Sequence, residues 1–205
     1  MATIPRYILK ATSASISIKV AELFLNLAIA SSLATLMGPS GFGKYSFIMA
    51  LVAIATIPVQ AGLPPLVVRE TSKHREKVKL GLIQGLVRRS HQLIAIMMVL
   101  LLGLYLAAVA ITSGNEERSQ TIISFGWALP LIPLLALNKL RSAVLRGFGN
   151  VIAGQVPDSV VRPLAFLGFI AGMHYITTEF DYADAMIAHA SGAFIAFVLG
   201  AILVS

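Results

Sequence analysis

Six long stretches of the sequence contain no Asp, Glu, Lys or Arg, and they limit what this chain can fold into. The stretches are 23–43, 45–68, 90–115, 119–138, 163–178 and 185–205. A helix needs about 20 largely apolar residues to cross a bilayer, so each stretch approaches or exceeds the length of one crossing. Only 12% of the 205 residues are charged, against about 25% in an ordinary soluble domain. The sequence therefore predicts an integral membrane protein.

The predicted fold is all-α, because an open sheet cannot satisfy its backbone groups in lipid. We expect one lobe over residues 1–205, a polytopic bundle of six transmembrane helices. Their expected ranges are about 13–37, 44–68, 82–112, 120–140, 155–177 and 183–204. Gly38-Pro39 closes the first helix, and a glycine-rich segment at 147–150 separates the fourth from the fifth. Pro58, Pro130 and Pro133 lie inside expected helices, where we expect kinks rather than ends.

The distribution of basic residues predicts the orientation, since loops rich in lysine and arginine stay in the cytoplasm. Thirteen of the sixteen basic residues lie in the N-terminal arm, after the second expected helix, or after the fourth. The alternate loops carry Lys44 and Arg118 against five acidic residues. We therefore expect a multi-pass protein of the plasma (inner) membrane with both ends in the cytoplasm.

The sequence ends with Leu203, Val204 and Ser205, at the end of an apolar run without a polar tail. Six crossings return the chain to its starting side, so a second six-helix unit would follow in the same orientation. We expect this chain to be the N-terminal lobe of a two-lobed transporter, with a missing C-terminal lobe or a homodimer partner.

Several other classes of function have little support. The net charge of +7 lies between membrane spans rather than on one solvated face, which argues against nucleic acid. Gly38 to Lys44 nearly spells a phosphate-binding loop, but Tyr45 stands where the magnesium-binding Ser or Thr belongs. The chain has no cysteine, and its four histidines fit no metal-ligand spacing. We expect no enzyme activity, no cofactor and no bound metal.

Three polar residues lie inside the first expected helix. Lys19, Glu22 and Asn26 follow one another by three and four positions, which places them along one face. An ionised side chain near the bilayer centre costs about 2.5 to 3.5 kcal/mol on insertion scales, so this face should point into the protein. One interpretation is an ion pair of Lys19 with Glu22, with the lysine reaching toward the headgroups. The other is a polar stripe that lines a cavity for a polar or anionic substrate.

Part of the sequence resembles the polysaccharide flippases, the oligosaccharidyl-lipid branch of the multidrug and polysaccharide exporter superfamily. The phrases that carry the resemblance are LATLMGPSGFGKY (33–45), AGLPPLVVRE (61–70), LRGFG (145–149) and then Arg162-Pro163. Together they span about residues 20–165, in the order shown by the N-terminal half of such proteins. The resemblance implies a lobe of a transporter that moves a lipid-linked oligosaccharide across the membrane by alternating access.

The resemblance also makes two arginines candidates for substrate binding. Arg69 directly follows the second expected helix, and Arg162 precedes Pro163 at the start of an apolar run. Arginine suits a pyrophosphate linkage because its planar fork binds phosphate through two parallel hydrogen bonds. The alternative is that both are ordinary cytoplasmic anchors of their helices.

Two further functions remain open. An ion-coupled multidrug exporter should have an acidic or aromatic cavity with a buried carboxylate, whereas a flippase should have a cationic cavity. A non-transporting membrane scaffold, or a gene remnant, should have no cavity. Glu22 is the one carboxylate that we expect well inside a span, within reach of Lys19, which argues mildly against the exporter.

The topology can be tested by single-cysteine labelling from outside the cell, because the natural chain has no cysteine. Positions Ser40, Asn115 and Thr178 lie in the expected outer loops, so cysteines placed there should react with a membrane-impermeant reagent. Positions Ser72 and Asn150 should be protected until the membrane is opened. Strong outside labelling at either of these two would overturn the topology.

Overall fold

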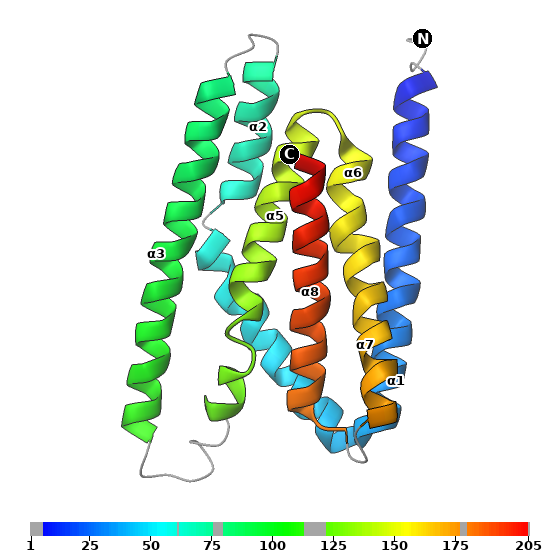
Figure 1. Cartoon of the computed structure of the whole chain (residues 1–205), viewed down its shortest axis with the longest axis vertical. Coiled ribbons are helices and arrows are strands. Elements are labelled where there is room, and N and C mark those ends of the chain that lie inside the picture. Colours follow the sequence, from blue (N-terminus) through cyan, green and yellow to red (C-terminus); the bar gives the residue numbers. More distant parts are fainter. Residues whose placement is uncertain (1–5, 61, 76–79, 113–121, 177–179, 205) are drawn as a thin grey trace.

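The computed structural model describes residues 6–60, 62–75, 80–112, 122–176 and 180–204. Helices account for nearly all of these residues, and no strand occurs among them. Figure 1 shows the helices running up and down one bundle, with the start of the first helix at Arg6 and the end of the last at Val204 toward the same end of it. The expected outer-loop positions Asn115 and Thr178 lie outside the described residues.

The first two expected helices are joined by a sharp corner instead of a loop. Helix α1 extends over Arg6–Gln60, but Gly38 inside it has φ 67° and ψ 178°, which are not helical values. Glycine adopts this backbone without the clash that a Cβ atom would create. Pro39 then occupies the first position of the second half, where a helix needs no N–H. The second half crosses diagonally behind α8 and α5 (Figure 1).

The second expected helix, 44–68, is not continuous. Its helical path stops at Gln60, and Gly62 has φ 70° before α2 begins at Leu63–Arg75. Proline can begin a helix but cannot continue one without losing a hydrogen bond, which explains why Pro64 and Pro65 follow the break. Helix α2 buries Val67 and Thr71. The expectation of one helix through this region is therefore wrong.

Helix α3 covers Leu80–Thr112, close to its expected range. The next expected helix, 120–140, differs: residues 122–126 are helical, 127–130 form turns, and α5 covers Leu131–Gly147. Pro130 precedes the first residue of α5, so it marks a helix start and not the kink that we expected. Three basic residues expected in the following loop, Lys139, Arg141 and Arg146, lie within α5.

The last two crossings begin at polar caps. Asn150 accepts a hydrogen bond from the Ala153 N–H and caps α6, Val151–Val156. A π-helix, Pro157–Val161 (η1), and α7, Arg162–Ile176, continue this crossing. Helix α8, Tyr182–Val204, begins after Asp181, whose carboxylate accepts from the backbone N–H groups of Ala183 and Asp184. This crossing starts within a residue of its expected position.

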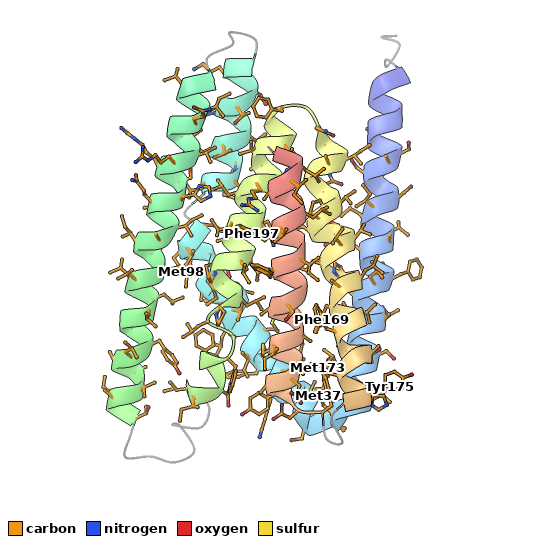
Figure 2. All side chains as sticks on the ribbon, in the orientation of Figure 1. Met37, Met98, Phe169, Met173, Tyr175 and Phe197 are labelled. Carbon is orange, nitrogen blue, oxygen red and sulfur yellow. The ribbon has the colours of Figure 1, made fainter. Side chains whose placement is uncertain are left out.

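The surface of the bundle is apolar enough to lie in the hydrocarbon of a bilayer. Among the described residues, five helical segments are long and apolar enough to span one. The first, Thr12–Gln60, is 49 residues long and is divided by the corner at Gly38. Large apolar side chains such as Leu27, Ile57 and Ile111 are more than 60% exposed. Figure 2 shows Tyr175, which is 90% exposed, projecting outward from the bundle. The predicted fold class, an all-α polytopic membrane protein, is confirmed.

The corner at Gly38 generates a prediction about stability. Gly38→Ala should lower the free energy of unfolding by about 1 to 3 kcal/mol, because alanine is strained at this φ and ψ. Gly43→Ala is the matched control: an added Cβ meets nothing within 4 Å at either position, but only Gly38 has a positive φ. The control should be neutral or stabilise by up to about 1 kcal/mol. Unfolding in mixed detergent micelles measures both, and equal effects would contradict this reading of the corner.

Candidate functional site

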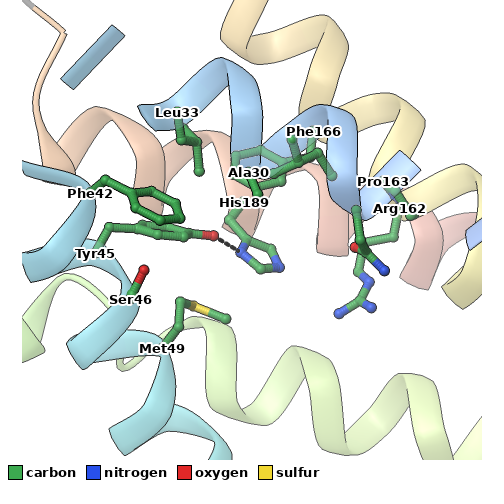
Figure 3. A pocket seen from close by; sticks show the side chains of 12 residues that line it. Ala30, Leu33, Phe42, Tyr45, Ser46, Met49, Arg162, Pro163, Phe166 and His189 are labelled. Carbon is green, nitrogen blue, oxygen red and sulfur yellow. Dashed lines mark hydrogen bonds between the residues drawn. The ribbon is translucent and has the colours of Figure 1, made fainter. Parts of the chain in front are cut away.

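A cavity of about 410 Å³ lies between the two halves of α1, α7 and α8. Asn26, Ser46 and Arg162 contribute polar groups to its lining, and the first two are exposed. Tyr45, Phe166 and His189 form a floor that is at least nine-tenths buried (Figure 3). The cavity lining contains one cation, Arg162, and no carboxylate.

The floor is held together by contacts among three elements. The Tyr45 hydroxyl on α1 lies 2.9 Å from Nδ1 of His189 on α8. The imidazole also stacks on the ring of Phe166 from α7, with 4.6 Å between ring centroids and 21° between planes. Gly192 allows this close approach, since a Cβ there would lie 3.0 Å from the Arg162 carbonyl oxygen and the Phe166 nitrogen. The floor therefore depends on close packing of α8 against α7.

Arg162 is placed by the π-helix before it. Pro163 has no N–H, so it cannot close the normal hydrogen bond of the helix. The helix widens here, and the backbone N–H of Arg162 donates to the Pro157 carbonyl, five residues back. The Asp158 carbonyl therefore loses the donor it would have in an α-helix, and Nε of Arg162 donates to it at 3.3 Å. This bond fixes the guanidinium close to the backbone, while its other nitrogens remain available to the cavity.

Two of the three polar residues of the first helix, Lys19 and Glu22, form an ion pair beside the π-helix η1. Lys19 Nζ lies 2.6 Å from Glu22 Oε2 and 3.4 Å from Ser159 Oγ on η1. Asn26 lines the cavity one turn further along. Helix α1 begins at Arg6, earlier than expected, so Lys19 lies about 20 Å along it at 1.5 Å per residue. The ion pair and the cavity-lining position are therefore both present on this face.

Arg69 lies apart from these residues. It is on α2, its side chain is 72% exposed, and its Nε donates to Glu70 Oε1 at 3.2 Å. It is not part of the cavity lining. The structure thus brings together Arg162, Asn26, Lys19 and Glu22 but leaves Arg69 separate.

Asp158 is a second carboxylate within a span, so the expectation that Glu22 alone would hold that position is wrong. Its side chain is 12% exposed, and Oδ2 lies 3.9 Å from Nζ of Lys139 on α5. Nearby, Arg141 donates to the Phe197 carbonyl and lies over the Phe197 ring, 3.5 Å from its centroid. These charges connect α5 with η1 and α8 and do not line the cavity.

Sequence reasoning missed the floor of the cavity. His189 was considered only as a metal ligand, and within the described residues no group of three or more metal-ligating side chains occurs. A polar imidazole inside an apolar span was itself a signal, because such residues usually face a bundle interior or a cavity. Tyr45 gave no signal of its own, since an aromatic residue near a helix end is ordinary in membrane proteins.

The fold and the cavity together define a polytopic membrane protein with a polar, cationic site inside its helical bundle. A family model described as "Polysaccharide biosynthesis protein" matches residues 8–205. The chain belongs to this family, and the resemblance seen in the sequence is confirmed at that level. No curated protein and no solved structure gives a significant match. The chain is thus a membrane protein of polysaccharide biosynthesis.

The pair of Lys19 and Glu22 can be tested by a double-mutant cycle. Lys19→Met and Glu22→Gln should each destabilise the protein, because each leaves a charge without its partner in the span. The double variant should lose less than the sum, with a coupling of at least about 0.5 kcal/mol. Lys73→Met, an exposed lysine on α2, is a control for general loss of charge. Zero coupling in micelle unfolding would show that the two charges act independently.

Proposed function

We propose that this protein takes part in moving a lipid-linked oligosaccharide across the plasma (inner) membrane. The head group would pass through the cavity by alternating access while the prenyl tail stays in lipid. The observation that carries the proposal is Arg162, a guanidinium held inside a membrane bundle on the wall of a cavity without carboxylates. The family membership supports the substrate class, because lipid-linked sugars are the membrane form in which polysaccharide units are built.

The physical problem in such transport is the charge of the linkage. A pyrophosphate is a dianion, and moving it out of water is very unfavourable unless fixed charges and donors replace its hydration. Arg162 is suited to this role because its planar guanidinium matches the geometry of phosphate oxygens. Nε is already bonded to the Asp158 carbonyl, so the outer nitrogens can form parallel hydrogen bonds with phosphate oxygens. Asn26 on α1 provides an amide donor to the same cavity.

The cavity argues against the alternatives weighed from the sequence. Its aromatic wall would also suit a drug exporter, but an exporter should have a carboxylate in the cavity to attract cationic drugs. The described carboxylates in the spans are Glu22, Asp158 and Asp184, and all three lie off the cavity lining. The scaffold hypothesis predicts no cavity at all. We propose a transporter without catalytic residues or cofactor.

A second unit completes the proposed pathway. The first half of α1 exposes Lys19 and Asn26 beside apolar residues such as Leu23 and Leu27, so this face is suited neither to lipid alone nor to water. We propose that a second lobe, or a second copy of this chain, covers it, and that both ends of the chain face the cytoplasm. Arg69 would then be a peripheral contact for the pyrophosphate on the cytoplasmic side, weaker than Arg162. The six-helix unit alone should not transport.

Lysine substitutions separate phosphate binding from anchoring. In an assembly that restores polysaccharide export, Arg162→Lys should reduce export at least about tenfold, because lysine keeps the charge but loses the bidentate fork. Arg69→Lys should reduce export less. Arg88→Lys on the exposed face of α3 is the matched control and should export normally. Surface polysaccharide is measured at equal membrane expression, and normal export from Arg162→Lys would remove its role in binding substrate.

A further inference from the structure

The two ends of the cavity differ in chemistry. Arg162 marks the end toward the π-helix, while Tyr45, Phe166 and His189 form the end toward the α1 corner. A pyrophosphate needs only the first end. Its oxygens accept hydrogen bonds from the guanidinium and gain nothing from an aromatic wall. The aromatic end therefore requires a different ligand group.

Resting on the function proposed above, we propose that this aromatic end binds the first sugar ring of the substrate, the pyranose attached directly to the pyrophosphate. A pyranose has apolar C–H faces and a ring of hydroxyl groups, so it fits a site that combines aromatic surface with a few polar groups. The cavity volume of about 410 Å³ is within the range of small-ligand sites, about 300 to 1,000 Å³. Ser46 and Asn26 add a hydroxyl and an amide on the exposed side of the cavity.

His189 is the residue that would recognise a sugar hydroxyl. Its Nδ1 is occupied by the Tyr45 hydroxyl at 2.9 Å, drawn as the dashed line in Figure 3. When the phenol donates to Nδ1, the neutral ring carries its proton on Nε2 and can donate from there. Figure 3 shows this edge of the ring, away from Tyr45, on the side that faces Arg162. A ligand held by Arg162 would thus extend toward the free edge of His189.

The packing around the imidazole makes it a fixed donor. Stacking on Phe166 sets the plane of the ring, and the bond to Tyr45 sets its rotation. His189 is 8% exposed, so little of it apart from the cavity edge is open to a ligand. A donor held in one direction distinguishes a hydroxyl in the right place from one that is absent or inverted, because a buried polar group left unpaired is costly.

Two amide substitutions at His189 test this role. His189→Asn keeps an acceptor near Nδ1 but removes the donor near Nε2, whereas His189→Gln places an amide donor near Nε2. The probes are geranyl pyrophosphate and the same lipid carrying one N-acetylhexosamine, bound to the chain in lipid nanodiscs. The natural chain should bind the sugar-bearing probe about tenfold more tightly. His189→Asn should abolish this preference, and His189→Gln should retain most of it.

Affinity for the sugar-free probe shows whether each variant is folded, and it should be unchanged in both. His174→Asn, on the exposed outer end of α7, is the matched control and should keep the full preference. Equal affinity of the natural chain for the two probes, or a preference that survives in His189→Asn, would overturn the sugar subsite while leaving the proposed transport intact. If neither probe binds more tightly than geraniol, which lacks the pyrophosphate, the proposed function fails together with the subsite.

Discussion

A bilayer offers no water to a backbone N–H or carbonyl, so every interruption of a helix must be compensated within the protein. Each proline inside a helix removes one backbone N–H donor. At Pro163 the structure shows which group compensates for the missing hydrogen bond. Pro163 cannot donate, the helix widens by one residue, and the Asp158 carbonyl takes its hydrogen bond from the Arg162 side chain. The Arg162 guanidinium is therefore held inside the bundle by the same hydrogen bond that satisfies the Asp158 carbonyl.

The cavity follows from this arrangement and from close helix approaches around it. Gly38 turns the chain so that the second half of α1 passes behind α8 in Figure 1 and places Tyr45 beside His189. Gly192 brings α8 against α7 so that the imidazole stacks on Phe166. The polar groups of the cavity thus come from residues far apart in the sequence. Tyr45 is placed by the corner at Gly38, Arg162 by the π-helix, and His189 by the missing Cβ at Gly192.

Most of the fold could be predicted because a chain inside a bilayer has few ways to satisfy its backbone hydrogen bonds. Apolar length predicted the helices, and α3 and α8 begin within two residues of their expected positions. The helix breaks were harder to predict. Pro130 could either kink a helix or begin one, and the choice depends on tertiary packing. The break at Gly62 was missed for a similar reason: glycine is tolerated inside a helix unless packing needs a positive φ. Helical spacing singled out Asn26, and the resemblance to the flippase family singled out Arg162; the structure places both on the cavity lining. His189 gave a local signal as a polar residue in an apolar span, but its contact with Tyr45, 144 positions away, leaves no local pattern.

Helix α1 has one face, with Asn26, Ile29 and Leu33, on the cationic cavity and the opposite face away from it. Asn26 and Ala28 are two residues apart, about 200° around the helix, and both are exposed. Because the chain has no cysteine of its own, Asn26→Cys and Ala28→Cys can be compared directly in native membranes. An anionic water-soluble thiol reagent should modify the position at 26 much faster than a cationic reagent of equal size, while position 28 should resist both. Equal rates at the two positions, or a preference for the cationic reagent at 26, would contradict the account.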